Sequence, residues 1–127
     1  MSILLRIAAL YSLAWAGALF YPSALPGAGA VDPAQRAMGY ALAVANLGYA
    51  VLFWAAARAP ARQRLVLYVA LLVFGLRGAI GTYQVLYALD GAPAVLQLVD
   101  MVLSVAAFVG MLNLLPGVLG AGRSPRM

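Results

Sequence analysis

Four long apolar runs constrain this chain more than any other feature of its sequence. Each contains roughly 20 predominantly apolar residues, the length that an α-helix needs to cross the hydrocarbon core of a bilayer. A backbone inside lipid must satisfy its own hydrogen bonds, so each run is expected to form one membrane-spanning helix. The four runs cover residues 3–20, 37–57, 65–89 and 94–115.

The composition supports lipid as the surroundings of these runs. Of the 127 residues, 66% are hydrophobic and only 9% are charged, whereas average soluble domains carry about 25% charged residues. So few charges could not cover the surface of a soluble domain. Short connections make successive helices antiparallel neighbours. We therefore predict an all-α integral membrane protein, a four-helix up-down-up-down bundle that forms a single transmembrane domain over residues 1–127.

Turn and capping residues indicate where two of the helices begin or end. Asp32 and Pro33 suit the cap and the first position of the second helix, so a lead-in could precede its apolar run. Pro116 and Gly117 are expected to end the fourth helix, because proline cannot donate a helical hydrogen bond.

The distribution of arginines predicts how the chain is threaded through the membrane. One side holds Arg36, Asp32 and Asp90. The other side holds most of the basic residues: Arg6, Arg58, Arg62, Arg64, Arg123 and Arg126. Because cytoplasmic loops carry an excess of basic residues, both termini are expected in the cytoplasm. An alternative is that the first run and Ala28-Gly29-Ala30 form a cleavable signal peptide.

The choice of charged residues narrows the source and the chemistry. All eight basic residues are Arg, and Ala and Gly are abundant, which suggests a GC-rich genome and hence a bacterial inner (cytoplasmic) membrane. The chain has no His, Cys or Lys. Metal, haem and iron–sulfur sites therefore lose their usual ligands, and a Schiff base is excluded. Most of the arginines cluster at the ends of apolar runs, which favours a membrane over a nucleic acid as the partner.

Arg77 is the strongest single indication of a functional site. It lies near the middle of the third run, where a charge is costly by roughly 2.5–3.5 kcal/mol, so it should face the interior and find partners. Gly81 and Gln84 follow on the same helical face. Asp100 is the one carboxylate within a run and is the natural ion-pair partner, either directly or through Gln84 or water.

Other runs supply polar groups at a similar depth. The candidates for a binding site with Arg77, Gln84 and Asp100 are Asn46, Ser104 and Tyr83; Tyr11, Ser12 and Trp15 add polar groups in the first run. Tyr83 and Tyr87 lie one turn apart and are either belt anchors or residues at a pocket mouth. The whole set could also be a hydrogen-bonded lock that fixes the helix register.

Glycines recur every three residues in the third run, at Gly75, Gly78 and Gly81, with Gly17 in the first run and Gly48 in the second. Small residues let membrane helices approach closely. We expect close packing inside one bundle, with a contact between copies of the chain as the alternative.

Residues 36–116 resemble the small four-span bacterial membrane proteins called DoxX-like. The resemblance rests on Arg77-Gly78 within the third run, Asp90-Gly91-Ala92-Pro93 before the fourth, and Asp100 inside the fourth. It implies a fold more than an activity, because most such proteins are uncharacterised, and it implies no catalytic residue.

Three classes of function remain open. The first is a non-enzymatic membrane protein, either an accessory subunit of a larger complex or a binder of a lipophilic molecule such as a quinone, isoprenoid or pigment. The second is an enzyme acting on an isoprenoid- or polyketide-like substrate, with Asp100 as general acid or base. Arg77 would then stabilise negative charge, and Tyr83 or Gln84 would orient the substrate. The third is a small transporter or channel formed by a homo-oligomer.

Overall fold

The structure, a computed structural model, describes residues 1–21, 32–87 and 92–121 of the chain. Every regular element within these residues is a helix: α1 (Ser2–Phe20), α2 (Pro33–Ala56), the short 3-10 turn η2 (Pro60–Arg62), α3 (Arg64–Tyr87) and α4 (Ala92–Ala121). The expectations that concern residues 28–30, Asp90, Arg123 and Arg126 lie outside the described residues.

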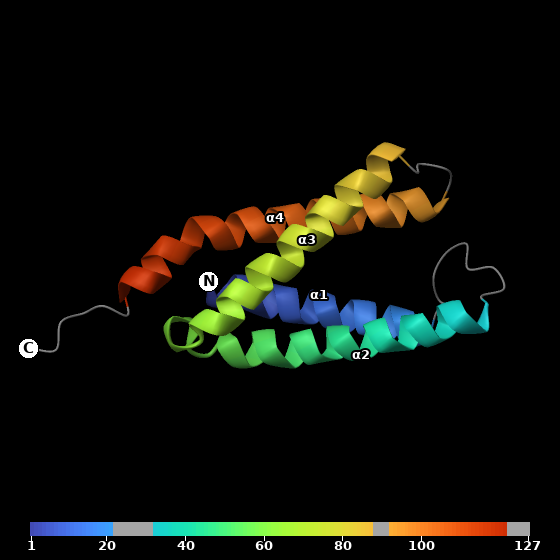
Figure 1. The fold of residues 1–127 in the computed structure, drawn as a ribbon. Coiled ribbons are helices and arrows are strands. Elements are labelled where there is room, and N and C mark those ends of the chain that lie inside the picture. The colour runs from blue at the N-terminus through green and yellow to red at the C-terminus, as the bar shows by residue number, and fades with distance from the viewer. Residues whose placement is uncertain (22–31, 88–91, 122–127) are drawn as a thin grey trace, which may run out of the picture.

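The four long helices run in alternating directions, as predicted (Figure 1). Each is long and apolar enough to cross a membrane. Four such helices are typical of a multi-pass helical membrane protein. The start of α1, the turn η2 and the last turns of α4 lie at one end of the molecule, where Met1, Pro60 and Val118 line one shallow hollow.

The helix ends differ from the limits of the apolar runs by one or two residues at most positions and by more at two, the start of α2 and the end of α4. α2 begins at Pro33, so its first turn precedes the apolar run, and Asp32 occupies the cap position without a side-chain hydrogen bond. The expected end of the fourth helix at Pro116 is wrong, since α4 continues through this proline to Ala121. Proline removes one backbone donor but its φ angle is helical, and membrane helices tolerate that loss.

The helices pair as two hairpins. α1 packs along α2 and α3 packs along α4, whereas the contacts between the two hairpins are few. Figure 1 shows the consequence: α3 crosses obliquely in front of α1 and rises away from α2 towards its C-terminal end. The hairpins are therefore joined over only part of their length.

Glycines let α3 approach α4 closely, as expected for packing within one chain. A Cβ added at Gly81 would lie 2.9 Å from the Cβ of Met101, and one at Gly78 would lie 2.9 Å from Cγ2 of Val105. The same expectation is wrong for Gly17 and Gly48, where an added Cβ would meet nothing within 4 Å among the described residues.

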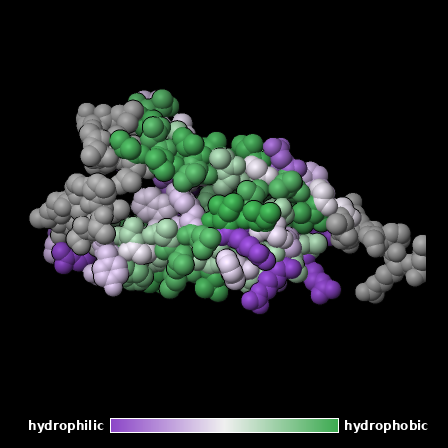
Figure 2. Space-filling model, turned by 180° about the vertical axis from the view of Figure 1, so that it is seen from behind, coloured by the Kyte–Doolittle hydropathy of each residue, from purple (hydrophilic) through white to green (hydrophobic). Residues whose placement is uncertain are grey.

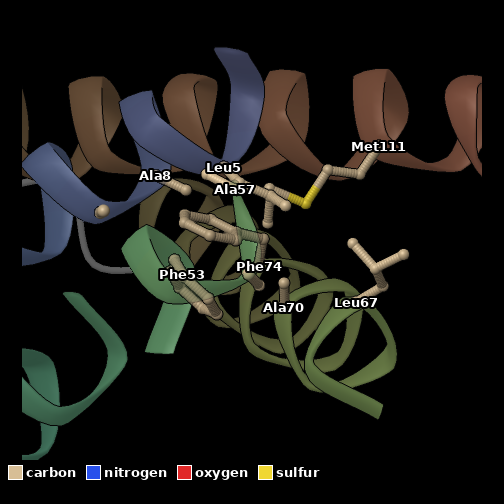
Figure 3. Close-up of a cluster of buried hydrophobic side chains, with 10 residues drawn as sticks. Leu5, Ala8, Phe53, Ala57, Leu67, Ala70, Phe74 and Met111 are labelled. Atoms are coloured by element: carbon tan, nitrogen blue, oxygen red, sulfur yellow. The ribbon is translucent and has the colours of Figure 1, made fainter. Parts of the chain in front are cut away.

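A hydrophobic core joins the two hairpins at the end that carries η2 (Figure 3). All four helices contribute to it, with Leu5 from α1, Phe53 from α2, Phe74 from α3 and Met111 from α4. Phe53 and Phe74 are tilted against each other with ring centroids 5.9 Å apart. Small buried alanines surround these side chains and allow the helices to come together: Ala8, Ala9, Ala56, Ala57 and Ala70.

Candidate functional site

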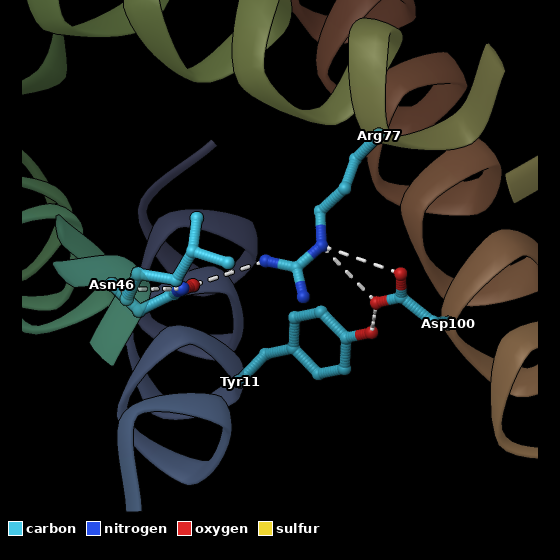
Figure 4. Close-up of polar contacts among 5 residues, drawn as sticks. Tyr11, Asn46, Arg77 and Asp100 are labelled. Carbon is cyan, nitrogen blue, oxygen red and sulfur yellow. Dashed lines mark hydrogen bonds and ion pairs between the residues drawn. The ribbon is translucent and has the colours of Figure 1, made fainter. Parts of the chain in front are cut away.

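Arg77 extends the buried face of α3 beyond the hydrophobic core. Leu67, Ala70 and Phe74 on this face are buried, and their spacing of three and four residues continues to Arg77. The arginine side chain therefore points from α3 towards the α1–α2 hairpin (Figure 4). The prediction that Arg77 faces the interior of the bundle and finds partners there is confirmed.

Arg77 pairs directly with Asp100 of α4. Nε of Arg77 lies 3.2 Å from Oδ1 and donates to Oδ2 at 3.4 Å. The side chains of the pair are only 23% and 18% exposed. Neither Gln84 nor a water is needed to bridge them. A direct pair offsets the cost of placing each charge in a medium of low dielectric constant.

The other hairpin supplies two neutral partners. Nη1 of Arg77 donates to the side-chain oxygen of Asn46 at 3.0 Å, and the Asn46 amide donates to the Leu42 carbonyl at 2.8 Å. The Tyr11 hydroxyl donates to Asp100. Each of the four long helices thus contributes one side chain to a single network, which we call the Arg77 cluster: Tyr11, Asn46, Arg77 and Asp100 (Figure 4).

Two aromatic rings of α1 lie against the guanidinium group. The Cζ atom of Arg77 is 5.5 Å from the Tyr11 ring centroid and 5.2 Å from the Trp15 centroid. Both distances fall within the range of a cation–π interaction, which strengthens when the cation is removed from water. Tyr11 and Trp15 are one helical turn apart and meet edge to face at 6.5 Å.

Two polar groups at this level have no partner among the described residues. Nε and Nη1 of Arg77 are engaged, and no acceptor in the described part of the chain bonds to Nη2 (Figure 4). Ser104 lies one turn along α4 from Asp100, and its buried hydroxyl oxygen is without a hydrogen bond in the same residues. A buried hydroxyl normally bonds, and the Arg77 side chain is partly exposed, so both groups are open to a further partner.

The structure brings together three of the candidates named from the sequence and adds one that was missed. Asn46, Arg77 and Asp100 meet in the cluster. Tyr83 does not, because the residue is 65% exposed and its ring lies against Tyr87 instead, tilted by 38°. The Gln84 side chain lies outside what the structure describes.

Tyr11 was expected as a polar group at this depth but was not among the candidate site residues. Tyrosine is amphipathic, and Tyr11 lies well inside the first apolar run, one turn before Trp15. Tyrosines at membrane depth are more often read as interfacial anchors than as hydrogen-bond donors. Only its proximity to Asp100, 89 residues later in the chain, reveals the role.

The described residues contain no group of three side chains that could hold a metal ion. Asp100 is the single carboxylate of the cluster, and its oxygens already accept hydrogen bonds from Tyr11 and Arg77. The cluster is therefore suited to holding a hydrogen-bonding group of a neutral or anionic molecule, through Arg77, rather than a cation.

Comparison with known proteins gives no relative from which a function could be transferred. No family model, curated protein or solved structure matches this chain.

Proposed function

We propose that this chain is a non-catalytic integral membrane protein that binds a lipophilic molecule with a hydrogen-bond-accepting head, such as a quinone, at the Arg77 cluster. One observation carries the proposal. The guanidinium is fixed by Asp100, Asn46 and two aromatic rings, yet it stays 23% exposed and has Nη2 without an acceptor in the described residues. The buried hydroxyl of Ser104, one turn from Asp100, also has no hydrogen-bond partner among the described residues, although a network that served only to lock the helices would be expected to satisfy its buried polar groups.

The aromatic residues support the same proposal. Tyr11 and Trp15 lie against the guanidinium, and the Arg77 side chain stays partly exposed. A flat conjugated head could stack on these rings while its carbonyl oxygen accepts a hydrogen bond from Arg77. The few contacts between the hairpins would let such a molecule enter sideways from the bilayer.

The geometry favours binding over acid–base catalysis. Asp100, the candidate acid or base, already accepts hydrogen bonds from Tyr11 and from Arg77. Tyr83, the candidate for orienting a substrate, is exposed and contacts Tyr87 rather than the cluster. Four other hypotheses remain: an accessory subunit of a larger membrane complex, an enzyme, an oligomeric transporter and a DoxX-like relationship. No contact of the Arg77 cluster specifically supports any of them.

The proposed location is a bacterial cytoplasmic membrane with both termini inside. The arginines support this orientation: Arg6, Arg58, Arg62 and Arg64 belong to the end that carries η2, whereas Arg36 and Asp32 belong to the start of α2 at the other end. An excess of basic residues on one side is typical of the cytoplasmic side.

Quinone titration tests the binding proposal. The Trp54→Phe variant keeps Trp15 as its single tryptophan, close to Arg77, so decylubiquinone bound at the cluster should quench its fluorescence. Arg77→Lys, which retains the charge and loses the planar fork, should weaken binding by about tenfold or more, the scale of a lost hydrogen bond to a charged group. Tyr83→Phe is the matched control and should bind as the parent does.

Native mass spectrometry of the protein released from mild detergent gives an independent readout. A retained small lipophile would support the proposal, whereas a co-purifying protein would favour the accessory-subunit hypothesis. A ligand-free chain that decylubiquinone does not quench would contradict quinone binding and leave the cluster as a structural lock.

A further inference from the structure

A second feature, separate from the Arg77 cluster, is an apolar groove between α1 and α2. It has a volume of about 460 Å³ and opens on the outside of the hairpin. Leu10 and Leu13 of α1 line it and lie on a different side of the helix from Tyr11, which faces α4. The residues that line most of its length are Leu10, Leu13, Leu47, Val51, Trp54 and Arg58.

The length of the groove is comparable to one leaflet of a bilayer. Its lining on α2 runs from Leu47 to Ala55, eight residues or about 12 Å at 1.5 Å per residue, and Arg58 extends the lining into the turn after the helix. Half of a hydrocarbon core of about 30 Å is about 15 Å. A single acyl chain lying along this groove would therefore extend from the bilayer surface to its midplane.

One end of the groove is positively charged. Arg58 lines it there, and the Cζ atom of Arg6 lies 5.9 Å from the centroid of Trp54. Both arginines are exposed, and neither forms an ion pair with a described residue. Figure 2 shows hydrophilic side chains gathered around the end of the hairpin that carries the α2–α3 connection, with hydrophobic surface beyond it.

We infer that this groove binds an anionic glycerophospholipid of the leaflet on the η2 side. Its phosphate is held by Arg6 and Arg58, and one acyl chain lies along Leu10, Leu13, Leu47 and Val51. Arginine forms forked hydrogen bonds with phosphate oxygens, and tryptophan favours the level of the lipid headgroups. The site does not depend on the ligand proposed for the Arg77 cluster.

Charge argues against a second copy of the chain as the occupant. Two copies with the same orientation in the membrane would meet through the same face in a two-fold dimer. Arg6 and Arg58 of one copy would then lie beside the same residues of the other, with no acidic side chain described at that end to compensate. An anionic lipid removes this repulsion instead of adding to it.

The first test compares two lipids and three charge variants. Native mass spectrometry counts the molecules of dioleoylphosphatidylglycerol and of dioleoylphosphatidylcholine retained by the full chain in detergent. The wild-type protein should prefer the anionic lipid. Arg6→Gln and Arg58→Gln should each weaken its retention by about fivefold, the contribution of one basic residue near an anionic leaflet. Arg36→Gln removes the same charge at the other end and should have no effect.

A further pair of variants tests the apolar part of the groove. Val51→Trp fills the groove at a residue that is 64% exposed and should reduce retention of the anionic lipid. Ile80→Trp on α3, at a residue that is 57% exposed, is its control. Circular dichroism confirms that each variant retains its helices.

Three results would overturn the inference. Equal losses in Arg36→Gln and Arg58→Gln would indicate diffuse attraction rather than a site. Unchanged retention in Val51→Trp would remove the acyl groove. A dimer that Val51→Trp converts to a monomer would show that a second copy occupies the groove.

Discussion

Nε of Arg77 lies 3.2 Å from Oδ1 of Asp100, and this ion pair lies within the α3–α4 hairpin rather than between the two hairpins. Both residues belong to the α3–α4 pair, so the charges are matched within it. The connections to the α1–α2 pair are made by neutral side chains, Asn46 and Tyr11. The α3–α4 hairpin therefore carries a compensated charge pair, and the neutral contacts set how the two hairpins meet.

Loss of one charge of the pair should cost more than loss of both. Removing one partner of a buried ion pair costs about 3–5 kcal/mol, and we expect the lower part of this range because the pair is partly exposed. Asp100→Asn and Arg77→Gln should each lower the free energy of unfolding in mixed micelles. The double variant should recover part of the loss. Strict additivity of the two single losses would contradict a direct interaction.

The hydrogen bond from the Tyr11 hydroxyl to Asp100 should stabilise the packing of the two hairpins against each other. Tyr11→Phe keeps the ring beside Trp15 and Phe74 but removes the donor to Asp100. The expected loss of stability is about 0.6–2 kcal/mol, the range for hydrogen bonds between membrane helices. Thermal unfolding followed by circular dichroism measures it. Tyr83→Phe makes the same chemical change at an exposed ring and should leave the melting temperature unchanged.

Glycines of α3 should differ from those of α1 and α2 in their tolerance of alanine. At Gly81 the new Cβ would lie 2.9 Å from the Cβ and 3.2 Å from the Cα of Met101, so the helices must separate. We expect Gly81→Ala to destabilise the protein by about 1–3 kcal/mol, as overpacking does. Gly48→Ala meets no described atom within 4 Å and should stabilise its helix by about 0.5–1 kcal/mol. Equal effects at both positions in denaturant unfolding would count against the close α3–α4 contact.

The proposed orientation in the membrane can be measured by labelling introduced cysteines, because the chain has no cysteine of its own that would react. Gln63→Cys introduces a thiol in the exposed α2–α3 connection, and Ala34→Cys introduces one at the exposed start of α2. A membrane-impermeant maleimide added to intact spheroplasts should label Ala34→Cys. It should reach Gln63→Cys only after the membrane is permeabilised. The opposite pattern would reverse the proposed topology.

The positions of the helices and the inward face of Arg77 follow from local properties of the chain. Length and hydropathy predict the four helices, and a charge within lipid has to face other protein groups wherever they come from. The same reasoning selects Asn46 and Asp100 as partners. This reasoning fails for Tyr83, because a tyrosine is polar enough for a binding site but is also stable at a membrane interface. It also fails for Pro116, because the last turns of a membrane helix tolerate the hydrogen bond that proline removes.

The sequence alone therefore determines that four helices form, which residues of each are costly to leave in lipid, and that the third helix carries a face of small residues. These are consequences of hydropathy and of the 3.6-residue period, which act within one helix. Only the tertiary structure decides that the helices pair as two hairpins, that Tyr11 meets Asp100 and that Nη2 of Arg77 keeps no partner in the described residues. These features depend on the rotation and depth of helices that are distant in the chain, and side-chain packing between them sets both.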